Sequence, residues 1–125
     1  MSLLSSLALI AVQAAVPQAA APQAAPPAPT RLTMPQQTAL RCSVGIAMAA
    51  ERQRTGTGAD PDWPDLTERG REFFVRSLAR LMDETGMTRE ALMQAAAPQV
   101  AELQQGEQLE EVMPACLLML NASGL

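Results

Sequence analysis

Two cysteines, Cys42 and Cys116, are the residues of this chain best suited to covalent chemistry. They lie too far apart in the sequence to form a C-x-x-C redox motif, and two thiols alone do not complete a zinc site. In an oxidising compartment we expect them to pair as a disulfide that joins the first and last elements of the folded domain. The alternative is a pair of buried free thiols, which would behave as small apolar side chains.

The remaining residue types exclude several kinds of active site. The chain has no His, no Tyr and, because all nine basic residues are Arg, no Lys. A Ser-His-Asp triad, a histidine zinc site and a Schiff-base lysine are therefore excluded. A nucleic-acid partner is also disfavoured, since 13 acidic residues give the chain a formal charge of −4. We therefore expect a protein that is not an enzyme and has no catalytic residue, cofactor or metal site.

One acidic cluster, formed by Asp60, Asp62, Asp65 and Glu68, offers the oxygen ligands that calcium prefers. An EF-hand loop, however, needs a regular series of such ligands around a central Gly, and a Trp-Pro pair interrupts the series here. Turn formation and helix capping explain these carboxylates more simply. We expect Asp62 or Asp65 to cap a helix.

Two further features have both a functional and a structural interpretation. Trp63 is the single Trp and stands at the entrance to a predicted helix. It either contacts a partner protein or folds back over the end of the core. Four arginines on the following helix could bind an anion by forked hydrogen bonds, although the acidic residues between them favour an ion-paired, solvated face: these are Arg69, Arg71, Arg76 and Arg80.

Helical periodicity is the only regular pattern after Thr30. The first predicted helix runs from Gln36 to about Arg52, and a Thr-x-x-Gln box beginning at Thr33 caps it. Because this helix is apolar around most of its circumference, we place it at the centre of the bundle.

Three more helices follow. The second runs to about Thr85, with Gly86 just after its end. Thr88 caps the third, which Pro98 must kink or restart. The last frays from Asn121 onwards. The third helix is expected to bury Leu92, Met93, Ala96, Val100 and Leu103, and the fourth Leu109, Val112, Met113, Cys116, Leu117 and Leu120. The sequence thus predicts an all-α, compact bundle of four or five helices.

The N-terminal part has a different character. Residues 1–14 are predicted to be a signal peptide, because the apolar run Leu3–Val12 precedes small residues at the cleavage positions. A membrane anchor is the alternative, but it needs about 20 apolar residues, so we expect no stable membrane insertion once the leader is removed. Residues 15–32 are rich in Ala, Pro and Gln and predict a disordered linker. Residues 33–125 form the helical domain.

Several segments carry a resemblance to other proteins. Arg41-Cys42 before an Ala-rich run, the block Arg69–Arg76, the block Leu81–Gly86 and Pro114–Leu117 resemble a set of small uncharacterised exported proteins of alphaproteobacteria. That family has two cysteines and no assigned activity, so the resemblance implies export and a disulfide and adds no mechanism. A weaker likeness to periplasmic acid-stress chaperones is one of architecture only.

These observations lead to a periplasmic or secreted helical protein that binds an unknown protein partner or client. Two other functions stay open. One is a chaperone activated by acid or stress, because protonated carboxylates would leave the arginines to repel one another. The other is a carrier of an apolar ligand. The identity of the partner, the biological process and the oligomeric state do not follow from the sequence.

Overall fold

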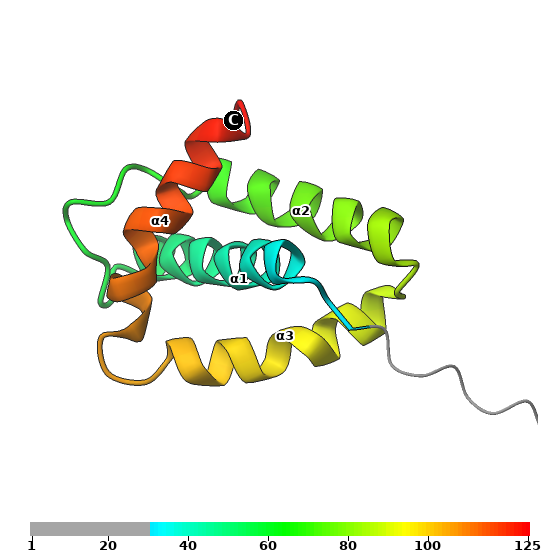
Figure 1. Ribbon diagram of the computed structural model, residues 1–125. Helices are drawn as coiled ribbons and strands as arrows, with labels where there is room; N and C mark the ends of the chain where they lie inside the picture. Colours follow the sequence, from blue (N-terminus) through cyan, green and yellow to red (C-terminus); the bar gives the residue numbers. More distant parts are fainter. Residues whose placement is uncertain (1–30) are drawn as a thin grey trace, which may run out of the picture.

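The computed structural model describes residues 31–125, which fold into four α-helices joined by loops (Figure 1). No strand occurs in this range, so the predicted all-α bundle is confirmed. The predicted signal peptide, residues 1–14, lies outside the described residues. All of the predicted linker except its last two residues lies outside them as well.

The first helix, α1 (Met34–Thr55), is the central one, as predicted, and contacts all three others (Figure 1). Its capping box is present: Thr33 Oγ1 accepts a hydrogen bond from the Gln36 N–H, and Gln36 Oε1 accepts one from the Thr33 N–H. The helix ends at Gly56, whose φ of 69° places it in the left-handed region. The buried positions of α1 are Leu40, Cys42, Ser43, Val44, Gly45, Ile46, Ala49 and Ala50.

The second helix, α2 (Arg69–Thr85), begins later than the sequence predicted. Neither Asp62 nor Asp65 caps it, because the N-cap is Glu68, which makes no side-chain capping hydrogen bond. Asp65 Oδ1 instead accepts hydrogen bonds from the N–H and the hydroxyl of Thr67. The carboxylate therefore closes a local turn, which competes with a helix start.

Gln53 of α1 explains why the chain before α2 does not join the helix. Its side-chain amide donates a hydrogen bond to the Pro64 carbonyl at 2.8 Å and accepts one from the Leu66 N–H at 2.8 Å. The Leu66 side chain is fully buried. One side chain thus satisfies backbone groups on both sides of Asp65 and holds this segment against α1.

The connection from α2 to α3 (Arg89–Leu103) agrees with the prediction. Gly86 ends α2 with a φ of 69°, and Thr88 Oγ1 accepts a hydrogen bond from the Ala91 N–H at the start of α3. Helix α3 continues through Pro98 as a single element, so the proline does not restart it.

Two predictions about the surface are wrong. Met93 was expected on the buried face of α3 but is 45% exposed, because its neighbour Leu92 occupies the position that faces α1. Asn121 was expected in a frayed end but belongs to α4 (Gln108–Ala122). Arg69 of α2 stabilises this end by donating to Asn121 Oδ1 and to the Leu125 carbonyl oxygen.

The core has two parts that meet along α1. One lies among α1, α4 and the start of α2 and contains Ile46, Phe73 and both cysteines. The other lies among α1, α3 and the end of α2 and contains Leu40 and Leu92. Between residues 31 and 125, no helix combines the length and apolarity that crossing a bilayer requires.

Candidate functional site

The two cysteines form a disulfide between the middle of α1 and the middle of α4. The Cα atoms of Cys42 and Cys116 are 5.0 Å apart, and both residues are buried. The predicted bridge between the first and last helices is therefore confirmed, and the alternative of two free thiols is wrong. An oxidised, buried sulfur pair is a structural brace and offers no thiolate as nucleophile. A disulfide is consistent with an oxidising compartment outside the cytoplasm.

The loop before α2 uses its acidic residues locally. Asp60 Oδ1 accepts a hydrogen bond from the Asp62 N–H, and Asp65 binds Thr67. The hydroxyl of Thr67, helped by its N–H, lowers the pKa of Asp65. Within residues 31–125, no three Asp, Glu, His or Cys side chains come close enough to hold a metal ion.

Trp63 lies in the same loop and is partly buried. Its ring packs against the core cluster that contains Leu66 and the disulfide. This contact is the one expected of a Trp that covers the end of a core. The structure thus supports the interpretation of Trp63 as a cover for the core, whereas its contact with a partner protein stays a prediction.

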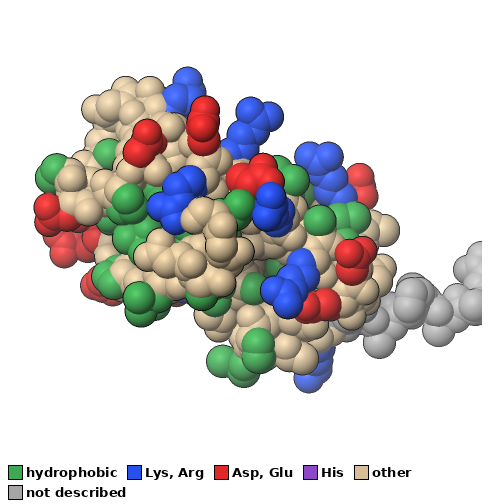
Figure 2. All heavy atoms as spheres, turned by 90° about the horizontal axis from the view of Figure 1, so that it is seen from above, with side chains coloured by type: hydrophobic (Ala, Val, Ile, Leu, Met, Phe, Trp, Pro, Cys, Tyr) green, Lys and Arg blue, Asp and Glu red, His purple; other side chains and the backbone are tan. Residues whose placement is uncertain are grey.

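The arginines of α2 lie on a face of mixed charge. Figure 2, which views the molecule from the side of α2, shows Arg and acidic side chains interspersed, with hydrophobic side chains between them. Arg76 pairs with Glu72 and Arg80 with Glu84, each across one helical turn. The predicted ion pairing is therefore confirmed for Arg76 and Arg80, whereas Arg71 forms no ion pair within residues 31–125. Arg69 differs, since its described partners are Asn121 and Leu125 on α4 and just beyond it.

A first groove, the α1–α2–α3 groove, lies over the side of α1 that faces away from the disulfide. Its floor is Val44, Ala47 and Met48, positions about half a turn around the helix from Cys42. Phe74 of α2 and Met93 of α3 stand on opposite walls. The groove has a volume of about 440 Å³, and the remaining lining residues are Glu51, Arg52, Ala96, Val100 and Gln104.

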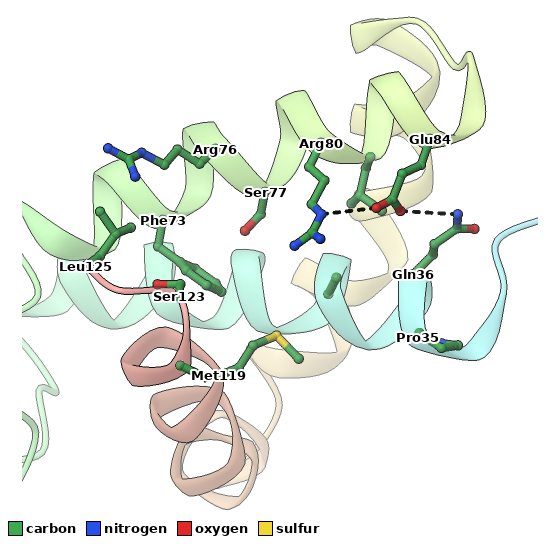
Figure 3. A pocket seen from close by; sticks show the side chains of 13 residues that line it. Pro35, Gln36, Phe73, Arg76, Ser77, Arg80, Glu84, Met119, Ser123 and Leu125 are labelled. Carbon is green, nitrogen blue, oxygen red and sulfur yellow. Dashed lines mark hydrogen bonds and ion pairs between the residues drawn. The ribbon is translucent and has the colours of Figure 1, made fainter.

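A second groove, the α1–α2–α4 groove, lies on the side of α1 that α4 crosses (Figure 3). Its volume is about 530 Å³. Phe73 and Leu81 of α2 are buried at its base, and Met119 of α4 lines the opposite side. Its polar lining comes mainly from Arg76, Ser77, Arg80, Glu84, Gln36 and Ser123, and its other lining residues are Pro35, Ala39, Ala122 and Leu125.

Sequence reasoning did not find either groove. Each combines residues from three helices, and helical periodicity reports which face of a helix is apolar but not where two helices diverge. A signal existed for the α1–α2–α3 groove: α1 is apolar around most of its circumference, and within this apolar run Ala47 and Met48 are only partly buried where they line the groove.

Comparisons with protein-family models, with curated proteins and with solved structures find no significant match to this chain. The grooves, the disulfide and the charged surface are therefore the observations from which a function is inferred.

Proposed function

We propose that this protein is an exported, non-enzymatic module that binds an amphipathic helix of a partner protein in the α1–α2–α3 groove. The observation that carries the proposal is the apolar groove between α2 and α3, where Ala47 and Met48 of α1 are only partly buried. Helices that are apolar all round are normally covered on every side. A helix presenting apolar residues at three- and four-residue spacing is the element that fills such a groove.

The side chains of the groove suit this kind of ligand. Met48 and Met93 have flexible thioether side chains that adapt to the shape of an apolar partner. Met93 is exposed on the rim, and Phe74 offers an aromatic surface across from it. Glu51 and Arg52 at one end provide charges of both signs that would orient the bound helix.

Export and the absence of catalysis have separate supports. The Cys42–Cys116 disulfide and the predicted signal peptide both favour the periplasm or the exterior. The chain lacks His, Lys and Tyr, and its cysteines are oxidised. Carboxylates are then the remaining groups for acid–base chemistry. Two of them, Glu51 and Glu84, line the grooves, and each is hydrogen-bonded to an arginine.

The test is site-specific photocrosslinking in the exported protein. A photoreactive residue at Met93 should give one dominant crosslinked protein, whose attachment site maps to an amphipathic helix. The same residue at Leu118, which is 72% exposed on α4 and lines neither groove, is the matched control. Crosslinks of equal yield at both positions, or none at Met93, would refute the proposal.

A second candidate, an acid-activated chaperone, is favoured by two ion pairs that join helices. Arg41 of α1 binds Glu102 of α3, and Arg52 of α1 binds Glu110 of α4. Because Asp and Glu carboxylates are mostly protonated below about pH 3, strong acid would break both links while the disulfide keeps α1 and α4 together. Suppression of a client protein's aggregation at pH 2 but not at pH 7 would support this function. Equal behaviour at the two pH values would contradict it.

A further inference from the structure

The α1–α2–α4 groove places an apolar surface directly beside hydrogen-bond donors that are not fully used. On the apolar side, Phe73 and Leu81 are buried beneath the groove, and Met119 and Leu125 are half-buried along it. On the polar side, Ser77 and Arg80 point from α2 toward α1 (Figure 3). A long apolar chain and a polar group attached to its end would thus meet matching surfaces.

The donors are available because Arg80 is only partly engaged. Its Nε donates to Glu84 Oε1 at 3.1 Å, whereas its two terminal nitrogens make no hydrogen bond to another residue between 31 and 125. A guanidinium carries five N–H donors in a fixed fork. Ser77 Oγ, nearby on the same helix, likewise has no hydrogen-bond partner within the described range. These groups can therefore hold an acceptor while the ion pair with Glu84 stays intact.

We propose that the α1–α2–α4 groove binds a long-chain fatty-acid anion. The alkyl chain lies over Phe73 and Met119, and the carboxylate accepts hydrogen bonds from the terminal nitrogens of Arg80 and from Ser77. Arg76, which also lines the groove and pairs through its Nε with Glu72, brings a second guanidinium to the site. Charge complementarity selects the anion: arginine forks match the geometry of a carboxylate, which would replace water at the terminal nitrogens of Arg80, a side chain that is 81% exposed.

One acidic side chain also faces the groove, and its contacts make it compatible with an anionic ligand. Glu84 is held by Arg80 Nε and, at 3.5 Å, by the Gln36 side-chain amide (Figure 3). One oxygen of Glu84 is thus bound to Arg80 and the other to Gln36. The ligand carboxylate would bind the other edge of the Arg80 guanidinium.

The volume of the groove, about 530 Å³, falls in the range of small-molecule sites, which is roughly 300–1,000 Å³. This site is separate from the α1–α2–α3 groove and shares none of its lining residues. The proposal of fatty-acid binding can therefore be tested separately from the proposal of partner binding.

The experiment is calorimetric titration of the folded, oxidised protein with dodecanoate below its micelle concentration. We expect saturable binding at one site, about tenfold weaker binding to Arg80→Gln, and unchanged binding to Arg71→Gln. Arg71 is an exposed arginine of the same helix that does not line the groove, so it is the matched control. Met119→Asp should abolish binding, whereas Leu118→Asp should not.

Three probes of equal chain length separate the contributions. Dodecanol lacks the charge and dodecyltrimethylammonium reverses it, so both should bind at least tenfold more weakly than dodecanoate. Equal binding of dodecanol would overturn the role of Arg80 and Ser77. Chemical-shift changes confined to Phe74 and Met93 would place the ligand in the other groove and overturn the assignment, as would the absence of saturable dodecanoate binding.

Discussion

Gly70 of α2 lies so close to Ile46 of α1 that a Cβ atom at position 70 would be 3.1 Å from Ile46 Cγ2. The same atom would be 3.2 Å from Ala50 Cβ and 3.4 Å from the Ile46 carbonyl oxygen. Both neighbours are buried, and a close-packed interior leaves them little room to move. The missing side chain at Gly70 thus sets how closely α2 approaches the central helix.

Gly70→Ala should destabilise the protein by about 1 kcal/mol, because overpacking costs more than the helix gains from alanine. Gly45→Ala is the matched control, since its Cβ would meet Leu109 Cδ1 at 3.6 Å, an ordinary contact. That variant should be more stable than the natural protein by about 0.5–1 kcal/mol. Urea denaturation of the two variants measures both effects, and stabilisation by Gly70→Ala would show that the helices can move apart freely.

The helices were predictable because their signals are local. The Thr33 capping box, the cap at Thr88 and the glycine at Gly86 each act within a few residues of the helix end. The start of α2 was not predictable in the same way. It depends on Gln53, a residue of another helix whose amide binds the backbone at Pro64 and Leu66. Sequence periodicity does not report contacts between a side chain of one helix and the backbone of another segment.

Removal of the disulfide should cost about 4 kcal/mol of stability. The bridge joins residues separated by 74 positions, and closing so long a loop removes much of the conformational entropy of the unfolded chain. The double variant Cys42→Ala, Cys116→Ala should therefore unfold at a much lower urea concentration than the oxidised protein. Reductant should lower the midpoint of the natural protein and leave that of the double variant unchanged. A loss below about 1 kcal/mol would mean that packing around Met113 and Leu120 alone holds α4 in place.

Arg52 should contribute more to stability than Arg54, although both belong to α1 and both pair with a glutamate. Arg52 is 25% exposed, and its Nη1 donates to the Gly58 carbonyl and, at 2.6 Å, to Glu110 of α4. Arg54 pairs with Glu51 on the helix surface. Loss of Arg52 removes the ion-pair partner of Glu110 between the helices. The other oxygen of this carboxylate is already buried and has no hydrogen-bond partner among residues 31–125.

We expect Arg52→Leu to lower the free energy of unfolding by about 1–3 kcal/mol. Arg54→Leu should change it far less, because water screens an exposed pair. Chemical denaturation in low salt gives both values. If the two variants unfold at the same urea concentration, the contact between α1 and α4 does not depend on this ion pair.

The grooves could not be predicted from the sequence, because they depend on how the helices pack against one another. Arg80 was recognisable only as a member of a charged helix face, and Met93 was assigned to the core. Each acquires its position from the divergence of neighbouring helices, which depends on side-chain volumes at crossings such as Gly70 and Ile46. The disulfide, in contrast, was predictable once export was inferred, because two cysteines in an oxidising compartment permit a single pairing.

The stability of the protein should fall as the pH drops below about 5. Protonation of Glu51 and Asp65 should account for part of this loss. The hydrogen bond from Arg54, aided by its charge, lowers the pKa of Glu51, and Thr67 lowers the pKa of Asp65. A carboxyl whose pKa is lower in the folded state stabilises that state above the unfolded pKa, about 4 for these residues. This stabilisation is lost as the pH falls through the folded-state pKa.

The urea midpoint should thus be level between pH 6 and 7 and decrease toward pH 3. Glu51→Gln should flatten part of this decrease, because it removes one of the two carboxyls whose pKa is lowered. A midpoint that rises on acidification would reverse the sign required by both carboxylates.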